Sequence, residues 1–360
     1  MKPSKIKNVA LKRMFVYNGE KGMQNSLFCK NEGAPPCPIC GEKSFPKWSD
    51  VVYFGKIAYA YTFMGCAGCE LHFMHPVPKR EILETFYKNL TKDTYGPYFF
   101  DEKCVFTNYP KLKMWIAEHR YSNRAGLLGR LKKLTAVAAE LISGRFVSYT
   151  LGIPLQEQSE AYMLDVGCGS GDWLIAMKSR GYSRLMGQDI AGPGLERLRR
   201  SKIAVFEGDL RDFKHPDNSF DLIRMEHVLE HLPDPIEYLS RIRSLLKPGG
   251  RLVINTPTVD SLTFQLAGRH WHALEPGFHL FFYTPSSLKC LGEKTNLRLV
   301  RWRYLPVFQQ AVHSAQNMGR TLITKILAYP FLRFFARPVY GITMKVLRTG
   351  DFLTAEFIKV

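Results

Sequence analysis

Short apolar runs alternate with amphipathic stretches along the second half of the chain, from Tyr162 onward. The runs have the length of buried strands, and the stretches between them place apolar residues on one face of a helix. The predicted strands are 162–166, 184–189, 203–206, 220–225 and 251–255, and the clearest helix is 236–246. Strands that alternate with helices in this way form a parallel sheet with helices on both faces. The pattern therefore predicts a doubly wound α/β domain.

The remaining segments have other patterns, which divide the chain into parts. Alternating aromatic residues near 51–63 predict a β-hairpin, and 78–90 and 109–142 have helical periodicity. Two more strands are expected at 297–308 and 350–360. We predict a basic lead-in (1–36), a small β module (37–77), a helical linker region (78–159), the α/β domain (160–308 and 350–360) and a helical insertion (309–349).

A glycine-rich turn follows the first strand of the α/β domain. Asp165 is followed by Gly167, Gly169 and Gly171, with Cys168 between the first two, and a helical pattern begins directly afterwards. Glycine permits positive φ and lets the backbone approach a ligand closely. The helix end adds unpaired N–H groups and a positive dipole end. We expect the turn to hold something small, flat and partly anionic.

The spacing of the glycines argues against a dinucleotide. That fingerprint is Gly-x-Gly-x-x-Gly, and here Asp172 stands at the position of its third glycine, where it would repel a pyrophosphate. A tight strand-to-helix turn without a ligand is the structural alternative. The segment Asp-x-Gly-x-Gly-x-Gly resembles motif I of the class I S-adenosylmethionine-dependent methyltransferases, where it surrounds the amino-acid end of the cofactor.

Two carboxylates follow the next two strands. Asp189 is at the tip of the second strand, where a carboxylate can accept hydrogen bonds from ribose hydroxyls. Asp209 follows the third strand and is placed to receive an exocyclic adenine amine, with Leu210 beside the ring. Either residue alone would be an ordinary loop carboxylate. Together with the glycine turn they form an ordered set.

The resemblance is closest around the fourth strand. The chain reads His227-Val-Leu-Glu230-His231 after this strand, then Leu246-Lys-Pro-Gly-Gly250, and later Pro276-Gly-Phe-His279. It resembles the class I methyltransferases that carry these segments, over about residues 160 to 305 and again at the C-terminus. The resemblance implies a seven-stranded, mostly parallel, Rossmann-like sheet whose last strand, within 350–360, is antiparallel. It also fits a zinc-binding N-terminal module, which occurs in related enzymes.

The resemblance also assigns the S-adenosylmethionine site by residue. The backbone of 167–169 would hold the methionine moiety, Asp189 the ribose, and Asp209 with Leu210 the adenine. Glu226 and His227 would line the pocket floor near the sulfonium. The full set expected to bind the cofactor is Asp165, Gly167, Cys168, Gly169, Gly171, Asp189, Ile190, Asp209, Leu210 and Glu226.

The expected reaction is an in-line displacement at the methyl group, accelerated by alignment and desolvation. An oxygen nucleophile gains further from a general base. Of the histidines in the relevant segments we favour His227 and His279, with His231 as a third candidate. The structural alternatives are that His231 only braces the first helical turn and that His270 and His272 order a lid around Trp271.

Two Cys-x-x-Cys pairs flank the predicted hairpin, Cys37 with Cys40 and Cys66 with Cys69. This is the arrangement of a zinc ribbon, in which four thiolates complete a tetrahedron and leave no open position. We therefore expect a structural zinc ion. A redox dithiol would belong in a βαβ context, which is absent here. His72 and His75 are expected to be ordinary polar residues, and Cys29 and Cys104 ordinary thiols.

The formal net charge of +18 and the pI near 9.5 suggest a polyanionic neighbour, although charge selects no single partner. The chain has no export signal and no apolar run long enough to span a membrane, which predicts a cytoplasmic protein. The insertion combines large apolar residues with six cations and no acidic residue over 320–348. Such helices suit the headgroup layer of an anionic membrane at its inner face. A helical pair packed on the domain, or in a dimer, is the alternative.

These observations support three functional hypotheses. The first is an O-methyltransferase that acts on a small, sugar-like or lipid-linked acceptor near the inner membrane face. The second is a nucleic-acid (RNA) methyltransferase that grips phosphate with the zinc module and the basic helices. Against it, the fourth strand ends in Met225-Glu-His227 and not in an Asn-Pro-Pro-Tyr segment. The third is a non-catalytic S-adenosylmethionine-binding module.

Overall fold

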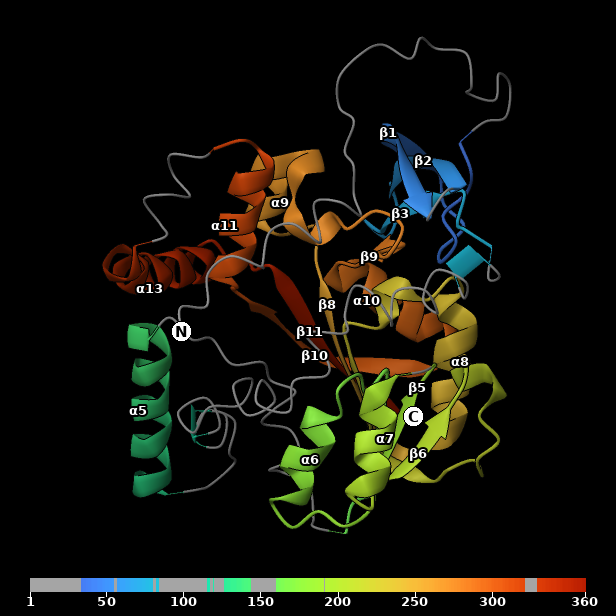
Figure 1. Ribbon diagram of the computed structural model, residues 1–360, viewed down its shortest axis with the longest axis vertical. Coiled ribbons are helices and arrows are strands. Elements are labelled where there is room, and N and C mark those ends of the chain that lie inside the picture. Colours follow the sequence, from blue (N-terminus) through green and yellow to red (C-terminus); the bar gives the residue numbers. More distant parts are fainter. Residues whose placement is uncertain are drawn as a thin grey trace.

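The computed structural model describes residues 34–54, 57–79, 82–83, 115–116, 119, 126–143, 160–190, 192–320 and 329–360 (Figure 1). The predicted lead-in falls almost entirely outside these residues. Most of the predicted linker region, with most of the predicted helix at 78–90, lies outside them, as do Cys29 and Cys104.

A seven-stranded sheet forms the centre of the main domain, in the order β10-β11-β8-β7-β4-β5-β6. Its strands are β4 (Met163–Val166), β5 (Leu185–Asp189), β6 (Ala204–Glu207), β7 (Phe220–Glu226), β8 (Leu246–Pro257), β10 (Leu297–Leu305) and β11 (Phe352–Lys359). Only β11 runs antiparallel to its neighbours, β8 and β10. The predicted fold class and the direction of the last strand are therefore confirmed.

Helices cover both faces of this sheet. Successive residues of β4 point to opposite faces, and accordingly Met163 and Leu164 belong to different hydrophobic clusters. The cluster that contains Met163 includes residues of α6 and α7, and the cluster that contains Leu164 includes residues of α8 and α10 (Figure 1). Their bounds are α6 (Asp172–Lys178), α7 (Pro193–Arg200), α8 (Pro235–Leu245) and α10 (Pro285–Lys294).

The strand predicted at 251–255 is longer at both ends in the structure. β8 already begins at Leu246 and includes residues 247–250, with Gly249 in the left-handed region at φ 73°. Leu246 pairs with Phe220 and Arg251 with Leu222, so the ladder contains an irregularity at the 247–250 segment. A glycine at this position lets the strand begin directly at the end of α8.

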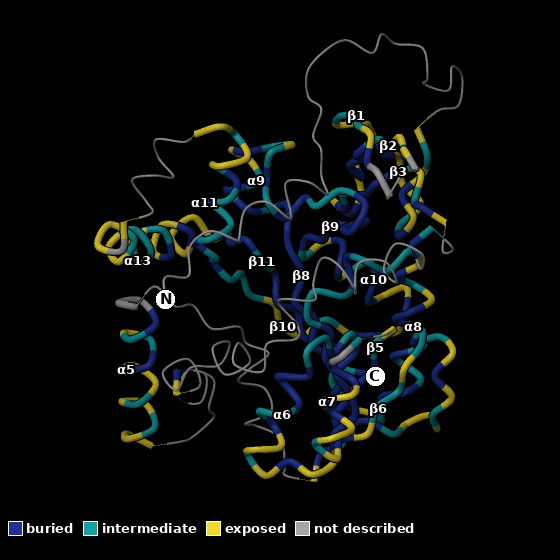
Figure 2. The backbone as a smooth tube through the Cα atoms, in the orientation of Figure 1, coloured by how far each residue is buried: buried dark blue, intermediate teal, exposed yellow. Residues whose placement is uncertain are grey.

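The N-terminal module and the main domain share a second sheet, of order β1-β2-β3-β9. The predicted hairpin is present as β1 (Ser44–Phe54) and β2 (Ile57–Cys66). It is followed by β3 (His72–His75), a strand that was not predicted. The fourth strand, β9 (Phe281–Phe282), comes from the main domain and pairs with His72 and Phe73. The hydrophobic cluster of α8 and α10 continues into the module without a break. The two parts therefore share one core (Figure 2).

The predicted insertion (309–349) forms helices on the other side of the molecule, beside a short helix of the main domain, 262–267. α9 (Leu262–Ala267), α11 (Phe308–Asn317) and α13 (Pro330–Val346) lie beyond the ends of β8 and β10 (Figure 1). Asp351, which is fully buried, holds them together, because it accepts hydrogen bonds from Ser261, Thr263 and Tyr340. α5 (Leu127–Ser143) packs against α13, and Lys345 pairs with Glu140 at 3.3 Å.

Three short 3₁₀ helices complete the loops at this edge of the sheet, and a fourth follows β6. They are Leu210–Asp212, Leu229–His231, Gly268–His270 and His272–Leu274. Among the described residues, no helix is both long and apolar enough to cross a membrane.

Candidate active site and cysteine cluster

The glycine turn between β4 and α6 has the backbone conformation that its sequence predicts. Gly167, Gly169 and Gly171 all lie in the left-handed region, with φ of 63°, 52° and 75°. A Cβ on Gly167 would lie 2.4 Å from the Val228 side chain, and a Cβ on Gly171 would lie 2.7 Å from Leu198. Both conformation and packing therefore require glycine at these two positions.

Two side chains of β5 brace this turn. Oδ2 of Asp189 accepts a 2.8 Å hydrogen bond from the Gly169 N–H, and Oδ1 accepts one from the Ile190 N–H at 2.8 Å. Gln188 accepts from the Gly167 N–H at 3.3 Å and donates to the Gly208 carbonyl at 2.6 Å. Gln188 was not predicted as a site residue. The sequence could have indicated it, because Gln188 comes immediately before Asp189 at the carboxyl end of a buried strand.

The Asp209 carboxylate already accepts several hydrogen bonds within the protein. The donors are the backbone and guanidinium of Arg211, the shortest bond being 2.7 Å, and the Tyr238 hydroxyl at 2.7 Å. Burial alone would raise the pKa of Asp209, but these donors lower it to about 2. Leu210 beside it is buried in the core, whereas Ile190 is 39% exposed. The adenine contacts of Asp209 and Leu210 stay predictions. For Asp209 to bind an adenine amine, Arg211 or Tyr238 would have to release one of its hydrogen bonds to the carboxylate.

A buried ion pair lies beneath the turn. Asp165 is 1% exposed and pairs with Arg224 at 2.7 Å, and Arg224 also pairs with Glu226 at 3.1 Å. Burial raises the pKa of Asp165 to about 6, although the Arg224 charge opposes this shift. Asn255 donates to the second Glu226 oxygen at 2.9 Å. Asp165 therefore holds the strands in place, and Glu226 presents its carboxylate at the carboxyl end of β7.

The structure brings the three predicted histidines together around Glu230. Nδ1 of His227 lies 3.2 Å from the Glu230 carboxylate, and the His227 ring contacts Phe352 edge-on at 4.6 Å between centroids. The His231 and His279 rings are 4.7 Å apart. His272 instead packs against His313. Glu230 is fully buried, and the sequence analysis did not select it as a site residue.

The charges of this group follow from burial and from the carboxylate. Burial alone would raise the pKa of Glu230, but the His227 contact and the neighbouring imidazoles lower it to about 2. Burial lowers the pKa of His231 to about 4 and lowers that of His279 as well. For His227, the Glu230 contact outweighs burial and raises the pKa. His227 is thus the member that gains a proton most readily, and its side chain is 38% exposed.

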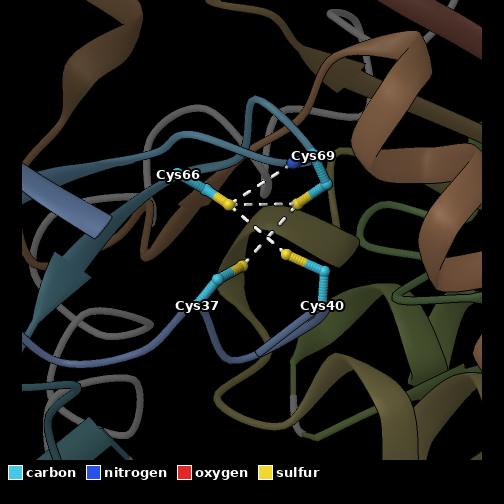
Figure 3. Close-up of side chains that lie close together, drawn as sticks. All are labelled: Cys37, Cys40, Cys66 and Cys69. Atoms are coloured by element: carbon cyan, nitrogen blue, oxygen red, sulfur yellow. Dashed lines mark hydrogen bonds between the residues drawn. The ribbon is translucent and has the colours of Figure 1, made fainter. Parts of the chain in front are cut away.

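The four predicted cysteine ligands also come together, at the base of the β1–β2 hairpin (Figure 3). Sγ of Cys37 lies 3.6 Å from that of Cys69, and Sγ of Cys40 lies 3.4 Å from that of Cys66. The Cys69 contact lowers the pKa of Cys37 to about 5. Two backbone N–H groups, from Gly68 and Cys69, point at the Cys66 sulfur. Four clustered sulfurs with backbone donors have the chemistry of a closed zinc site.

Comparisons with known proteins agree with this geometry. Residues 138–301 match the family described as a methyltransferase domain. A ubiquinone biosynthesis O-methyltransferase of Aeromonas salmonicida is 28% identical over 193 residues, which covers 50% of this chain and 77% of the relative. A demethylmenaquinone methyltransferase of Lactiplantibacillus plantarum is 33% identical over 105 residues, covering 26% and 44%. A tRNA U34 carboxymethyltransferase of Pseudoalteromonas atlantica is 28% identical over 160 residues, covering 41% and 48%.

A geranyl diphosphate C-methyltransferase structure from Streptomyces coelicolor overlays with a TM-score of 0.41 and 14% identity, covering 57% of this chain and 74% of the other. Four of the curated relatives, including the L. plantarum and P. atlantica enzymes, are matched over less than half of their own length. The resemblance inferred from the glycine turn and the 227–231 segment is nevertheless confirmed, because the matched region contains both.

Proposed function

From a chain that contains a class I, S-adenosylmethionine-dependent methyltransferase domain, we propose an enzyme that methylates an oxygen of a small, sugar-like or lipid-linked acceptor. The observation that carries this proposal is the arrangement at the carboxyl ends of β4, β5 and β7. There the left-handed glycine turn, the Asp189 carboxylate and the Glu226–His227 pair lie on neighbouring strands. Quinone methyltransferases among the relatives support a small acceptor.

The residues present fit the expected cofactor. The turn offers three glycines at which the backbone can approach a ligand, and the Asp189 carboxylate lies against it at the carboxyl end of β5. S-adenosylmethionine would supply a methyl group bound to a positively charged sulfur. The Glu226 carboxylate, at the end of β7, provides negative charge for that sulfur.

His227 is the residue we assign to proton removal. Its Nδ1 faces Glu230, so its Nε2 is the atom available to accept the hydroxyl proton of an acceptor. Glu230 stabilises the imidazolium that results, as its effect on the pKa of His227 indicates. His231 and His279 have lowered pKa values and direct Nδ1 to backbone carbonyls, which makes them poorer bases.

We also propose that α13 and α5 form a membrane-facing surface. Figure 2 shows exposed positions along both helices, and their large apolar residues are Leu127, Leu128, Leu131, Leu134, Phe331, Leu332, Phe334, Phe335, Val339, Ile342 and Val346. Exposed apolar patches of this kind mark partner or membrane surfaces. The basic residues of α13 favour an anionic surface, which is where a lipid-linked acceptor would be found.

The experiment that tests the function uses S-adenosylmethionine labelled on its methyl group. The full-length protein is incubated with host extract, and the products are separated into lipid, soluble-glycan, nucleic-acid and protein fractions. We expect label in the lipid or glycan fraction, and none with the Asp189→Ala variant. Label in nucleic acid would replace this proposal with an RNA methyltransferase. Bound cofactor without label in any fraction would support the non-catalytic binding module.

A further inference from the structure

Glu230, His231 and His279 form a second group of metal-ligating residues, apart from the cysteines. One ligand atom from each lies within 4.8 Å of the other two. Glu230 and His231 belong to the 3₁₀ helix Leu229–His231 after β7, and His279 belongs to the loop before β9. The Leu280 N–H donates to the Glu230 carbonyl at 2.7 Å, so the two segments are joined by their backbones.

The backbone fixes which nitrogen of each ring faces this group. Nδ1 of His231 lies 2.8 Å from the Phe278 carbonyl, and Nδ1 of His279 lies 2.7 Å from the Ala273 carbonyl. A carbonyl only accepts, so both Nδ1 atoms must carry the proton. In the neutral rings, Nε2 then carries a lone pair. Metal-binding histidines are commonly oriented by such an outer hydrogen bond.

While both imidazoles are neutral, their lone pairs and the Glu230 carboxylate repel one another unless a proton or a cation lies between them. A nitrogen of each ring and a carboxylate oxygen come close in a buried place, where Glu230 is 0% and His279 is 8% exposed. Because both Nδ1 atoms face carbonyls, we infer that these nitrogens are the Nε2 atoms. The Oε2 atom of Glu230 is buried, and within the described part of the chain it has no hydrogen-bond partner. A buried polar atom without a partner costs about 1–3 kcal/mol, and more when it is charged. A proton or a metal ion would satisfy it.

We propose that Glu230, His231 and His279 bind a divalent transition-metal ion through one carboxylate oxygen and the two Nε2 atoms. Two histidines and one carboxylate form the donor set of open Fe²⁺ and Zn²⁺ sites, whereas Mg²⁺ and Ca²⁺ prefer oxygen ligands. Glu275 Oε2, 3.7 Å from Nε2 of His279, is a further oxygen donor beside the group. Three protein ligands leave a position for a water molecule or a substrate oxygen.

The position of the site gives it a role, which rests on the proposed function. His227 contacts Glu230 directly, so the ion would lie beside the residue assigned to proton removal. A bound divalent ion lowers the pKa of a coordinated hydroxyl. An acceptor oxygen held there would lose its proton near neutral pH, and His227 would receive that proton. The binding of the ion itself does not depend on this role.

The test is a Co²⁺ titration of the full-length, untagged protein after its metals have been removed. Co²⁺ at the cysteine cluster gives strong thiolate-to-metal absorption, whereas Co²⁺ at a nitrogen and oxygen site gives only weak visible bands. We expect wild-type protein to bind a second equivalent that adds weak bands alone. Glu230→Gln with His279→Asn should lose this equivalent and keep the thiolate absorption. His270→Ala, a histidine outside the group, should keep both.

The wild-type titration decides the proposal even if the double variant fails to fold. A single equivalent with thiolate absorption would overturn it, and so would a second equivalent that persists in a folded double variant. Calorimetric binding of S-adenosylmethionine to the same samples separates this result from the proposed function. Wild-type protein that binds S-adenosylmethionine but no second ion refutes the metal site alone, whereas absence of cofactor binding refutes the methyltransferase proposal.

Discussion

The Asp189 carboxylate accepts a 2.8 Å hydrogen bond from the Gly169 backbone N–H, across the gap between β5 and the glycine turn. One side chain therefore holds the turn and also faces the place where a ribose is expected. Asp189 thus has a structural contact with the turn and a predicted contact with the cofactor. Replacing it tests the geometry of the turn and the ligand assignment together.

Asp189→Ala should weaken S-adenosylmethionine binding by roughly 10- to 100-fold, measured by calorimetry. The variant loses hydrogen bonds to a charged group, each worth about 1.5–3 kcal/mol, and each 1.4 kcal/mol is a factor of about ten. Asp217→Ala is the matched control, because Asp217 is an exposed carboxylate that pairs only at the surface with Arg241. Unchanged affinity in Asp189→Ala would contradict the pocket assignment.

Removal of the zinc ion predicted at the cysteine cluster should destabilise more than the N-terminal module. β3 pairs with β9, the Thr284 hydroxyl donates to the Cys69 carbonyl at 3.4 Å, and one core runs through both parts. We therefore expect one cooperative thermal transition, which moves to lower temperature on chelation. Structural zinc contributes directly to folding free energy, so the shift should be large.

Calorimetry of Cys40→Ser and Cys290→Ser measures this coupling. Cys40 belongs to the cluster and Cys290 does not, so only the former variant should lose zinc and melt at lower temperature. Two separate transitions, of which only one responds to metal, would show instead that the module folds by itself.

The contact between the N-terminal module and the main domain shows where prediction from the sequence ends. The strands of the large sheet and the β1–β2 hairpin follow from apolar runs and alternation, and the four cysteines follow from their spacing, because these signals are local. The pairing of β3 with β9 joins residues about two hundred positions apart through two phenylalanines, which have no recognisable pattern. The boundary drawn at residue 77 stays a prediction, although the shared sheet argues that it does not separate independent folding units.

The active-site residues show the same limit. Asp189 was predicted because it ends a strand, and its hydrogen bonds agree with that position. Glu230 was passed over, although it is the residue around which His227, His231 and His279 gather. Its role depends on the loop before β9 folding back onto the end of β7. Sequence spacing alone does not show such a contact.

Asp209 should make the free energy of unfolding depend on pH in the acid range. Its pKa is about 2 in the folded protein and 3.8 ordinarily, because Arg211 and Tyr238 stabilise the charged form. The stabilisation is therefore complete above about pH 4 and is lost as the pH falls toward 2, with a total of about 2 kcal/mol.

Urea unfolding of wild-type protein and Asp209→Asn between about pH 6 and pH 3 tests this assignment. The two free energies should differ most near neutral pH and converge as the pH falls. Comparison with the variant removes the effect of acid on the cysteine cluster, which is the same in both proteins. A difference that stays constant with pH would show that Asp209 contributes through packing and not through its charge.

The α13 surface should bind anionic vesicles through its phenylalanines. Phe331, Phe334 and Phe335 are 71%, 59% and 53% exposed, and full burial of such a side chain contributes about 1.5–3 kcal/mol. Replacing all three with serine should therefore reduce co-sedimentation with phosphatidylglycerol vesicles by roughly a hundredfold or more. Leu266→Ser with Trp302→Ser is the matched control, since both residues are exposed and lie outside α13 and α5. Added salt should weaken wild-type binding, because cations on α13 contribute as well. Equal sedimentation of the triple variant and the control would assign this surface to a packed partner helix or a second copy of the chain.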